Sequence, residues 1–166
     1  MPRHVRRILA RFISVTVVTL LTTAADSRAE SPGGDPLFGA ARRALSREIS
    51  TSAVARALRA GLWSPSREAV AASFPRPAGT VVFVFIRQGG GEFLAADASH
   101  VEGANLAKLG RSRAYYDKIE TAPARWLERN DGWLQVVIRT SAWKSGRRFT
   151  ASEPLLIKPD GTVMWR

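Results

Sequence analysis

The feature that most restricts the fold is an apolar run in the middle of the chain. Residues 80–86 are all β-branched or aromatic, so both faces of a strand formed by them would be apolar or β-branched. This pattern is typical of a strand covered on both faces. We therefore expect this strand to be central in its sheet. Three glycines at 89–91 mark a tight turn, and residues 92–96 are expected to return as a partner strand.

The last third of the chain predicts an antiparallel meander. We expect strands at residues 133–143, 147–158 and 162–165, joined by turns at 144–146 and 159–161. Pro154 has no N–H to donate to a neighbouring strand, so a bulge or a sheet edge is expected there. The preceding segment 122–129 is compatible with a helix or a strand, and its periodicity does not decide between them.

Helices are expected before these strands. Asp35 is a good N-cap, and Pro36 suits the first helical position because its missing N–H costs nothing there. Apolar residues then recur at spacings of four or five as far as Leu58, opposite a face of arginines, which indicates one amphipathic helix ending at Gly61. A second, short helix is expected over 66–73.

The segment between the two groups of strands, residues 97–120, is less regular. Ser99 and Glu102 have the spacing of a capping box, but Gly103 disfavours a long helix, so we expect a loop with one helical turn. Residues 111–119 are expected to be helical. This order of elements predicts an α+β domain in which N-terminal helices precede a single five-stranded, mainly antiparallel sheet. The sequence does not fix the order of the strands in that sheet.

The N-terminus predicts export. Residues 1–11 carry four arginines and no acid, and the apolar stretch 12–21 follows, as in a signal peptide. Small residues at Ser27 and Ala29 suit a cut before Glu30. We therefore expect a periplasmic or secreted protein organised as a signal peptide at 1–29, a linker at 30–36 and a single α+β domain at 37–166.

This segment has two alternative interpretations. A transmembrane anchor needs about 20 apolar residues, and the apolar stretch here is shorter. Arg6 and Arg7 are compatible with a twin-arginine export signal and with an ordinary basic leader, so the export route stays open.

Cysteine usage and charge limit the possible functions. The chain has no cysteine, which excludes disulfides, thiolate metal sites and a lipid anchor on cysteine. Removing the predicted signal peptide takes away five arginines and one aspartate and leaves a net charge of +7. A basic exported domain can associate with anionic lipids, cell-wall polymers or nucleic acid. The arginines are scattered along the chain, however, so a solvated cationic surface is the simpler interpretation.

Four short motifs lie at the joints of the expected elements: Gly79-Thr80-Val81-Val82-Phe83-Val84-Phe85, Phe93-Leu94-Ala95, Gly103-Ala104-Asn105-Leu106 and Gly132-Trp133. Together they resemble the Cache family, the extracellular PAS-like ligand-binding domains of bacterial sensors. The resemblance implies a PAS-like sheet, and a cystatin-like or nuclear-transport-factor-like sheet is the alternative. The chain departs from the family at Arg87-Gln88, where the family has an acidic turn, and at Ala96-Asp97, where it has His-Pro.

No catalytic constellation stands out. Asp97, Ser99 and His100 are the residue types of a hydrolytic triad, but neighbours on one loop do not easily converge on one nucleophile. Asp97, His100 and Glu102 lack the spacing of a zinc motif, and no phosphate-binding Gly-x-x-x-x-Gly-Lys loop occurs. We expect no catalytic residues, no metal and no cofactor, and a non-enzymatic protein, with an enzyme as the remaining alternative.

Aromatic residues and an arginine near the expected joints of helix and sheet give the candidate ligand-binding residues Arg139, Trp143, Tyr115, Tyr116 and Asn105. Aromatic rings bury a ligand's body, and an arginine binds a carboxylate through two parallel hydrogen bonds. Arg139 and Trp143 share a strand face by parity. We expect Arg139 to contact a small anionic ligand between the sheet and the 97–119 crossing. The main alternative is a cross-strand ion pair between Arg139 and Glu153.

Two functions therefore remain open. The first is an exported, non-enzymatic ligand-binding or sensory accessory domain for a small anionic molecule. The second is a cationic protein that binds the envelope or another polyanion. Both functions are compatible with a sensor or envelope partner, and the sequence does not decide whether one exists. Sequence-specific binding to nucleic acid is not expected, and neither is a transmembrane segment after cleavage.

Overall fold

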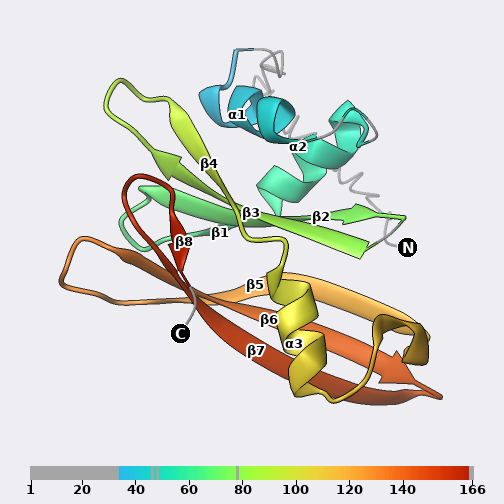
Figure 1. The fold of residues 1–166 in the computed structure, drawn as a ribbon. Helices are drawn as coiled ribbons and strands as arrows, with labels where there is room; N and C mark the ends of the chain where they lie inside the picture. The colour runs from blue at the N-terminus through green and yellow to red at the C-terminus, as the bar shows by residue number, and fades with distance from the viewer. Residues whose placement is uncertain (1–33, 46, 48, 78, 165–166) are drawn as a thin grey trace, which may run out of the picture.

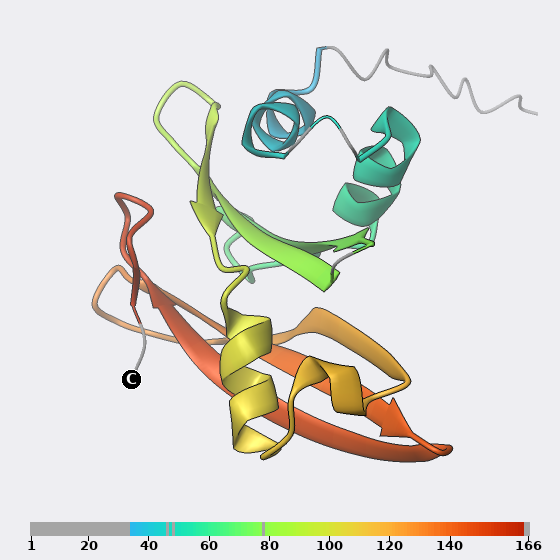
Figure 2. The same ribbon diagram turned by 45° about the vertical axis from the view of Figure 1, so that its right-hand side comes forward.

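The computed structural model describes residues 34–45, 47, 49–77 and 79–164, which form three layers (Figure 1). Helices α1 and α2 lie on one face of a first antiparallel sheet, and a second antiparallel sheet lies on its other face (Figures 1 and 2). Helix α3 lies beside the first sheet and packs on the second. The predicted signal peptide lies outside the described residues.

Each sheet contains four antiparallel strands in sequence order. The first sheet consists of β1 (Leu62–Trp63), β2 (Ala69–Arg76), β3 (Gly79–Arg87) and β4 (Phe93–Asp97). The second sheet consists of β5 (Lys118–Leu127), β6 (Leu134–Lys144), β7 (Arg147–Ile157) and β8 (Val163–Met164). The prediction of a single five-stranded sheet, PAS-like or cystatin-like, is therefore wrong. The crossing that follows β4 carries the chain into another layer, so β5 pairs with β6 and the described strands do not join into one sheet.

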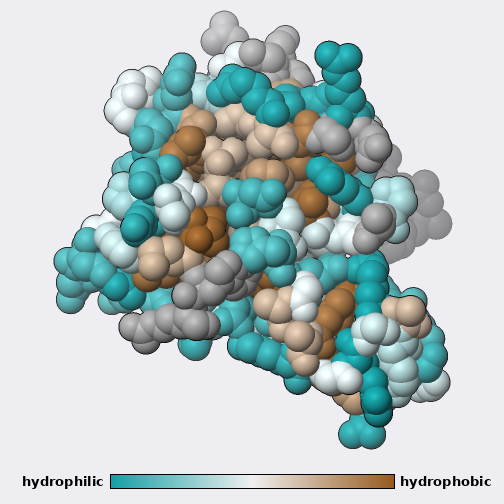
Figure 3. All heavy atoms as spheres, viewed as in Figure 1, coloured by the Kyte–Doolittle hydropathy of each residue, from teal (hydrophilic) through white to brown (hydrophobic). Residues whose placement is uncertain are grey.

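The expectation for residues 80–86 is confirmed, because β3 lies between β2 and β4 and is covered on both faces. Phe83 and Phe85 face the helices and stack with their ring centroids 6.0 Å apart. Val82 and Val84 face the second sheet and are fully buried. Figure 3 shows that surface apolar residues gather where the helices meet this sheet, while most of the remaining visible surface is hydrophilic.

The N-terminal helix begins as predicted but ends early. Asp35 Oδ1 accepts a hydrogen bond from the backbone N–H of Leu37 (2.9 Å), and α1 spans Pro36–Ala44. A separate helix, α2, spans Thr51–Arg59 with Ser50 as its N-cap. The predicted single helix is therefore wrong. The chain turns between the two helices, and both can then lie on the twisted first sheet with Leu45 and Ile49 buried.

The predicted short helix over 66–73 is a strand for most of its length. Ser64 Oγ accepts from the backbone N–H of Ala69 (3.0 Å) and so closes the turn that leads into β2. Residues 69–72 are buried between the helices and the second sheet and pair with β3. Ladder hydrogen bonds and burial on both faces outweigh the helical preference of this alanine-rich sequence.

The crossing between the sheets also differs from its prediction. It contains an eight-residue helix, α3 (Val101–Lys108), rather than one turn, and a short 3-10 helix at Arg113–Tyr115 rather than a helix over 111–119. The undecided segment 122–129 belongs largely to β5. Strand β8 pairs with β7 only at Leu156 and Ile157, so the rest of β7 forms an edge of the second sheet. Pro154 lies on that edge, and the expectation of a sheet edge is confirmed.

Candidate functional site: the outer face of the second sheet

The two faces of the second sheet have different surroundings. On the inner face, Ile138 and Leu155 pack against the first sheet, and Ala142 packs against Leu106 of α3. Strand alternation points the residues between these toward the opposite side. No described element covers that side, as Figures 1 and 2 show. We call it the outer face.

Strand register places the same-facing residues of β5, β6 and β7 side by side on the outer face. Its charged side chains are the four cations Lys118, Arg125, Arg139 and Arg148 and the acid Glu120. Glu120 forms an ion pair with Lys118 at 2.6 Å, and both side chains are more than half exposed. Even with Glu120 counted, the outer face keeps an excess of three positive charges.

Trp143 holds two of these cations in place. Lys118 Nζ lies 5.0 Å from the centroid of the Trp143 ring, and Arg148 Cζ lies 5.3 Å from it. Arg148 Nη2 also donates a hydrogen bond to Ser141 Oγ (2.8 Å). Cation–π contacts of this kind stabilise the position of a charged group while leaving it hydrated. The ring is thus already occupied, and it is not an open platform on which a ligand could stack.

The other end of the outer face is mainly apolar, with Arg125 as its charged residue. Its half-buried side chains are Leu127, Val137, Pro154 and Leu156, and Met164 is 37% exposed. Leu156 pairs with Gln135 on one side and with Met164 of β8 on the other. Apolar side chains therefore concentrate at the Gln135 end of the outer face, while the cations extend from the Trp143 end as far as Arg125.

The sequence-predicted ligand-binding residues do not form one site. Arg139 is exposed on the outer face opposite Ala122 and Ser152, as the shared parity with Trp143 predicts. This places it on the side of the sheet away from the 97–119 crossing. Glu153 pairs in register with Ile138 on the inner face and forms an ion pair with Lys108 of α3, so the alternative of an Arg139–Glu153 ion pair is wrong.

The other three candidates lie near the crossing. Tyr116 is buried and packs against Phe149, with ring centroids 6.0 Å apart. Tyr115 is 41% exposed, with Lys144 Nζ 5.5 Å from its ring centroid. Asn105 is fully buried: its Nδ2 donates to the Ile138 carbonyl oxygen (3.2 Å) and to Thr140 Oγ1 (3.1 Å). These contacts give Tyr116 and Asn105 a packing role.

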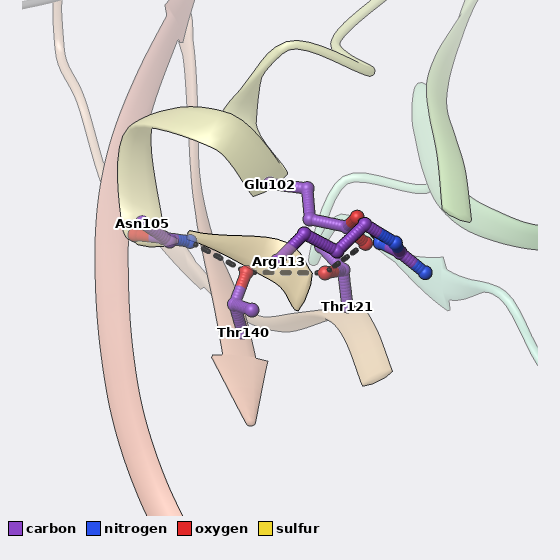
Figure 4. Close-up of polar contacts among 5 residues, drawn as sticks. All are labelled: Glu102, Asn105, Arg113, Thr121 and Thr140. Carbon is purple, nitrogen blue, oxygen red and sulfur yellow. Dashed lines mark hydrogen bonds and ion pairs between the residues drawn. The ribbon is translucent and has the colours of Figure 1, made fainter. Parts of the chain in front are cut away.

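Asn105 belongs to a chain of buried polar groups between α3 and the second sheet (Figure 4). Thr140 Oγ1 lies 3.1 Å from Thr121 Oγ1, and Thr121 Oγ1 donates to Glu102 Oε2 (2.8 Å). Glu102 Oε1 in turn forms an ion pair with Arg113. The cluster ties the crossing to β5 and β6, and each bond in it satisfies a polar group that would be costly to bury alone.

The residues considered for a triad form a turn. Asp97 Oδ1 accepts from the backbone N–H of Ser99 (2.8 Å) and from its hydroxyl. Partial burial lowers the pKa of His100, an effect that the nearby Asp97 carboxylate opposes. Within the described residues, no group of three or more His, Cys, Asp or Glu side chains is placed to hold a metal ion.

Sequence reasoning missed Lys118, Arg125 and Arg148 as members of the outer face. Lys118 and Arg148 could be placed once the strand register is known, because each pairs with Trp143 on a neighbouring strand and so lies on the same face of the sheet. Arg125 could not be placed this way, because the register of β5 shifts between Pro123 and Arg125.

Comparison with known families, curated proteins and solved structures finds no match to this chain. The resemblance to the Cache family therefore stays a prediction from its motifs. A membrane-spanning helix is absent from the part of the chain that the structure describes.

Proposed function

We propose that this chain is an exported, non-enzymatic domain that docks on an anionic phospholipid surface of the cell envelope through the outer face of its second sheet. Export follows from the predicted signal peptide. One observation carries the docking: four cations from three strands project from an uncovered face that has a single acid. Anionic membranes attract such clusters by about 1 kcal/mol for each Lys or Arg near the surface.

The spread of the charges favours an extended partner over a small ligand. Lys118 and Arg148 flank Trp143, whereas Arg125 lies opposite Val137, six residues away along β6. At about 3.3 Å per residue this separation is about 20 Å. A small organic acid cannot contact both ends at once. A lipid surface or a polymer can.

The apolar end of the face favours a lipid surface over a soluble polyanion. Val137, Leu156 and Met164 would lie against the boundary between headgroups and acyl chains while the cations contact the headgroups. Single-stranded nucleic acid, by contrast, is bound largely by stacking of bases on aromatic rings. Trp143 is covered by Lys118 and Arg148 and offers no such ring.

The test is co-sedimentation of the purified protein with phosphatidylcholine vesicles, with and without phosphatidylglycerol. The double variant Arg139→Gln/Arg148→Gln removes two charges from the outer face. The matched control, Arg56→Gln/Arg59→Gln, removes the same charge from the exposed side of α2. At about 1 kcal/mol per cation, the first variant should bind anionic vesicles about 30-fold more weakly. The control should bind nearly as well as the unmodified protein.

Binding should also weaken as salt is raised, since exposed charges are screened. Equal losses in the two variants would show that net charge alone acts and would refute the assigned face. Tighter binding to heparin or DNA than to anionic vesicles would instead indicate a soluble polyanion as the partner.

A further inference from the structure

A hollow lies on the other side of the molecule, between strands β2 and β3 and the first turn of α3. Its volume is about 270 Å³. It is lined by residues from three segments: Arg76, Gly79, Thr80, Val81, Ser99, Glu102 and Gly103. We infer that this hollow binds the carboxylate of a small organic acid through the guanidinium of Arg76. The inference is independent of the lipid docking proposed above.

The acid that lines the hollow is already satisfied. Glu102 Oε1 is paired with Arg113, and Glu102 Oε2 accepts from Thr121 Oγ1 at 2.8 Å (Figure 4). A Cβ added at Gly79 would lie 3.0 Å from Arg113 Nη1 and 3.1 Å from Glu102 Oε1. The bare backbone of Gly79 thus lets this ion pair lie directly against the end of β3.

Arg76 is the cation that remains. Among the described residues it has no ion-pair partner, and its Nε is buried without a hydrogen-bond acceptor. The Nε has almost no accessible surface, so a ligand in the hollow would meet the guanidinium through its terminal N–H groups, which can form two parallel hydrogen bonds to a carboxylate. With Glu102 and Arg113 neutralising each other, the hollow has a net charge of +1.

The charge and size of the hollow select the ligand class. A carboxylate is a monoanion whose two oxygens match the forked donors of an arginine. A phosphate dianion would leave excess negative charge beside Glu102. The volume is just below the range of about 300–1,000 Å³ that is typical of small-molecule sites. The ligand is therefore a small acid.

The direct measurement is the NMR signal of the Arg76 Nε–H in the unmodified protein during titration with acetate and propionate at constant ionic strength. The signal should shift with saturation. Acetamide, which is neutral and close in shape to acetate, should leave it unchanged. Thermal stabilisation by the same acids gives a second readout.

Arg76→Gln should weaken acid binding about tenfold or more, because a charged hydrogen bond is lost. Arg56→Gln, which removes an equal charge from the exposed side of α2, should leave the affinity unchanged. The outer-face variant Arg139→Gln/Arg148→Gln should also bind the acids normally, so failure of the lipid proposal and failure of this one are distinguishable.

Three outcomes would overturn the inference. They are an Arg76 signal that neither acid shifts, an Arg76→Gln variant that binds the acids as tightly as the unmodified protein, and tighter binding of phosphate than of either carboxylate. If Arg76→Gln does not fold, the titration of the unmodified protein still decides.

Discussion

Asn105 joins helix α3 to the second sheet, and its replacement by alanine tests how far that junction depends on one side chain. Its Nδ2 donates to the Ile138 carbonyl oxygen at 3.2 Å and to Thr140 Oγ1 at 3.1 Å. Pro123 is the residue opposite Ile138 in β5, and it has no N–H to offer. The amide of Asn105 therefore donates to a carbonyl beside the irregular part of the sheet.

The expected loss follows from these contacts. Each hydrogen bond contributes a net of about 1 kcal/mol, and a buried carbonyl left without a donor costs about 1–3 kcal/mol more. Part of this is offset, because Asn105 Oδ1 is itself buried without a partner and disappears in the variant. We expect Asn105→Ala to lower the free energy of unfolding by about 2–3 kcal/mol. For a domain of this size that corresponds to a fall in Tm of about 10 °C.

Urea unfolding followed by tryptophan fluorescence measures this loss. The control is Asn130→Ala, the same substitution at an exposed position, which should change the free energy of unfolding by no more than about 0.5 kcal/mol. If Asn105→Ala is as stable as the control, the buried polar chain does not hold α3 on the sheet and the reasoning is refuted.

Two further substitutions test individual contacts. Gly79→Ala should lower the free energy of unfolding by about 1–3 kcal/mol in the same urea assay, since Gly79 has φ +142° and an added Cβ meets the Arg113–Glu102 pair; an unchanged midpoint would contradict the geometry. Asp117→Asn should destabilise the protein at pH 7 and much less at pH 3. Hydrogen bonds from the Ser145 backbone N–H and the Lys144 side chain hold the pKa of Asp117 below its usual value. The stabilisation is therefore present above the unfolded pKa and disappears as pH falls through the folded pKa; equal losses at pH 7 and pH 3 would count against this account.

The elements that the sequence predicts correctly are those whose signal is local. The N-terminus of α1 is decided by Asp35 and Pro36, because a cap needs only its own neighbours. The meander from β6 to β8 is bounded by short turns, and β3 is apolar on both faces whatever covers it. The same holds for the shared face of Arg139 and Trp143, which follows from the alternation of one strand.

The wrong predictions concern segments whose conformation depends on distant partners. Residues 69–72 have helical preference but form a strand, because β1 and β3 supply hydrogen bonds on either side. Helix α3 extends past the expected single turn because Asn105 and Leu106 find partners on the second sheet. The partners that decide these two conformations lie on other strands of the fold, so the periodicity of each segment alone could not reveal them.

The features of the candidate sites also divide into those that the sequence determines and those that depend on the tertiary structure. The sequence by itself determined the basic charge, the absence of cysteine and the parity that puts Arg139 beside a tryptophan face. Only the tertiary structure decided that this face is uncovered, that cations from β5 and β7 join it, and that Arg76 meets the first turn of α3 at a hollow. The physical reason is that alternation fixes which residues of one strand share a side. Which element covers that side depends on how the two sheets and the crossing pack together.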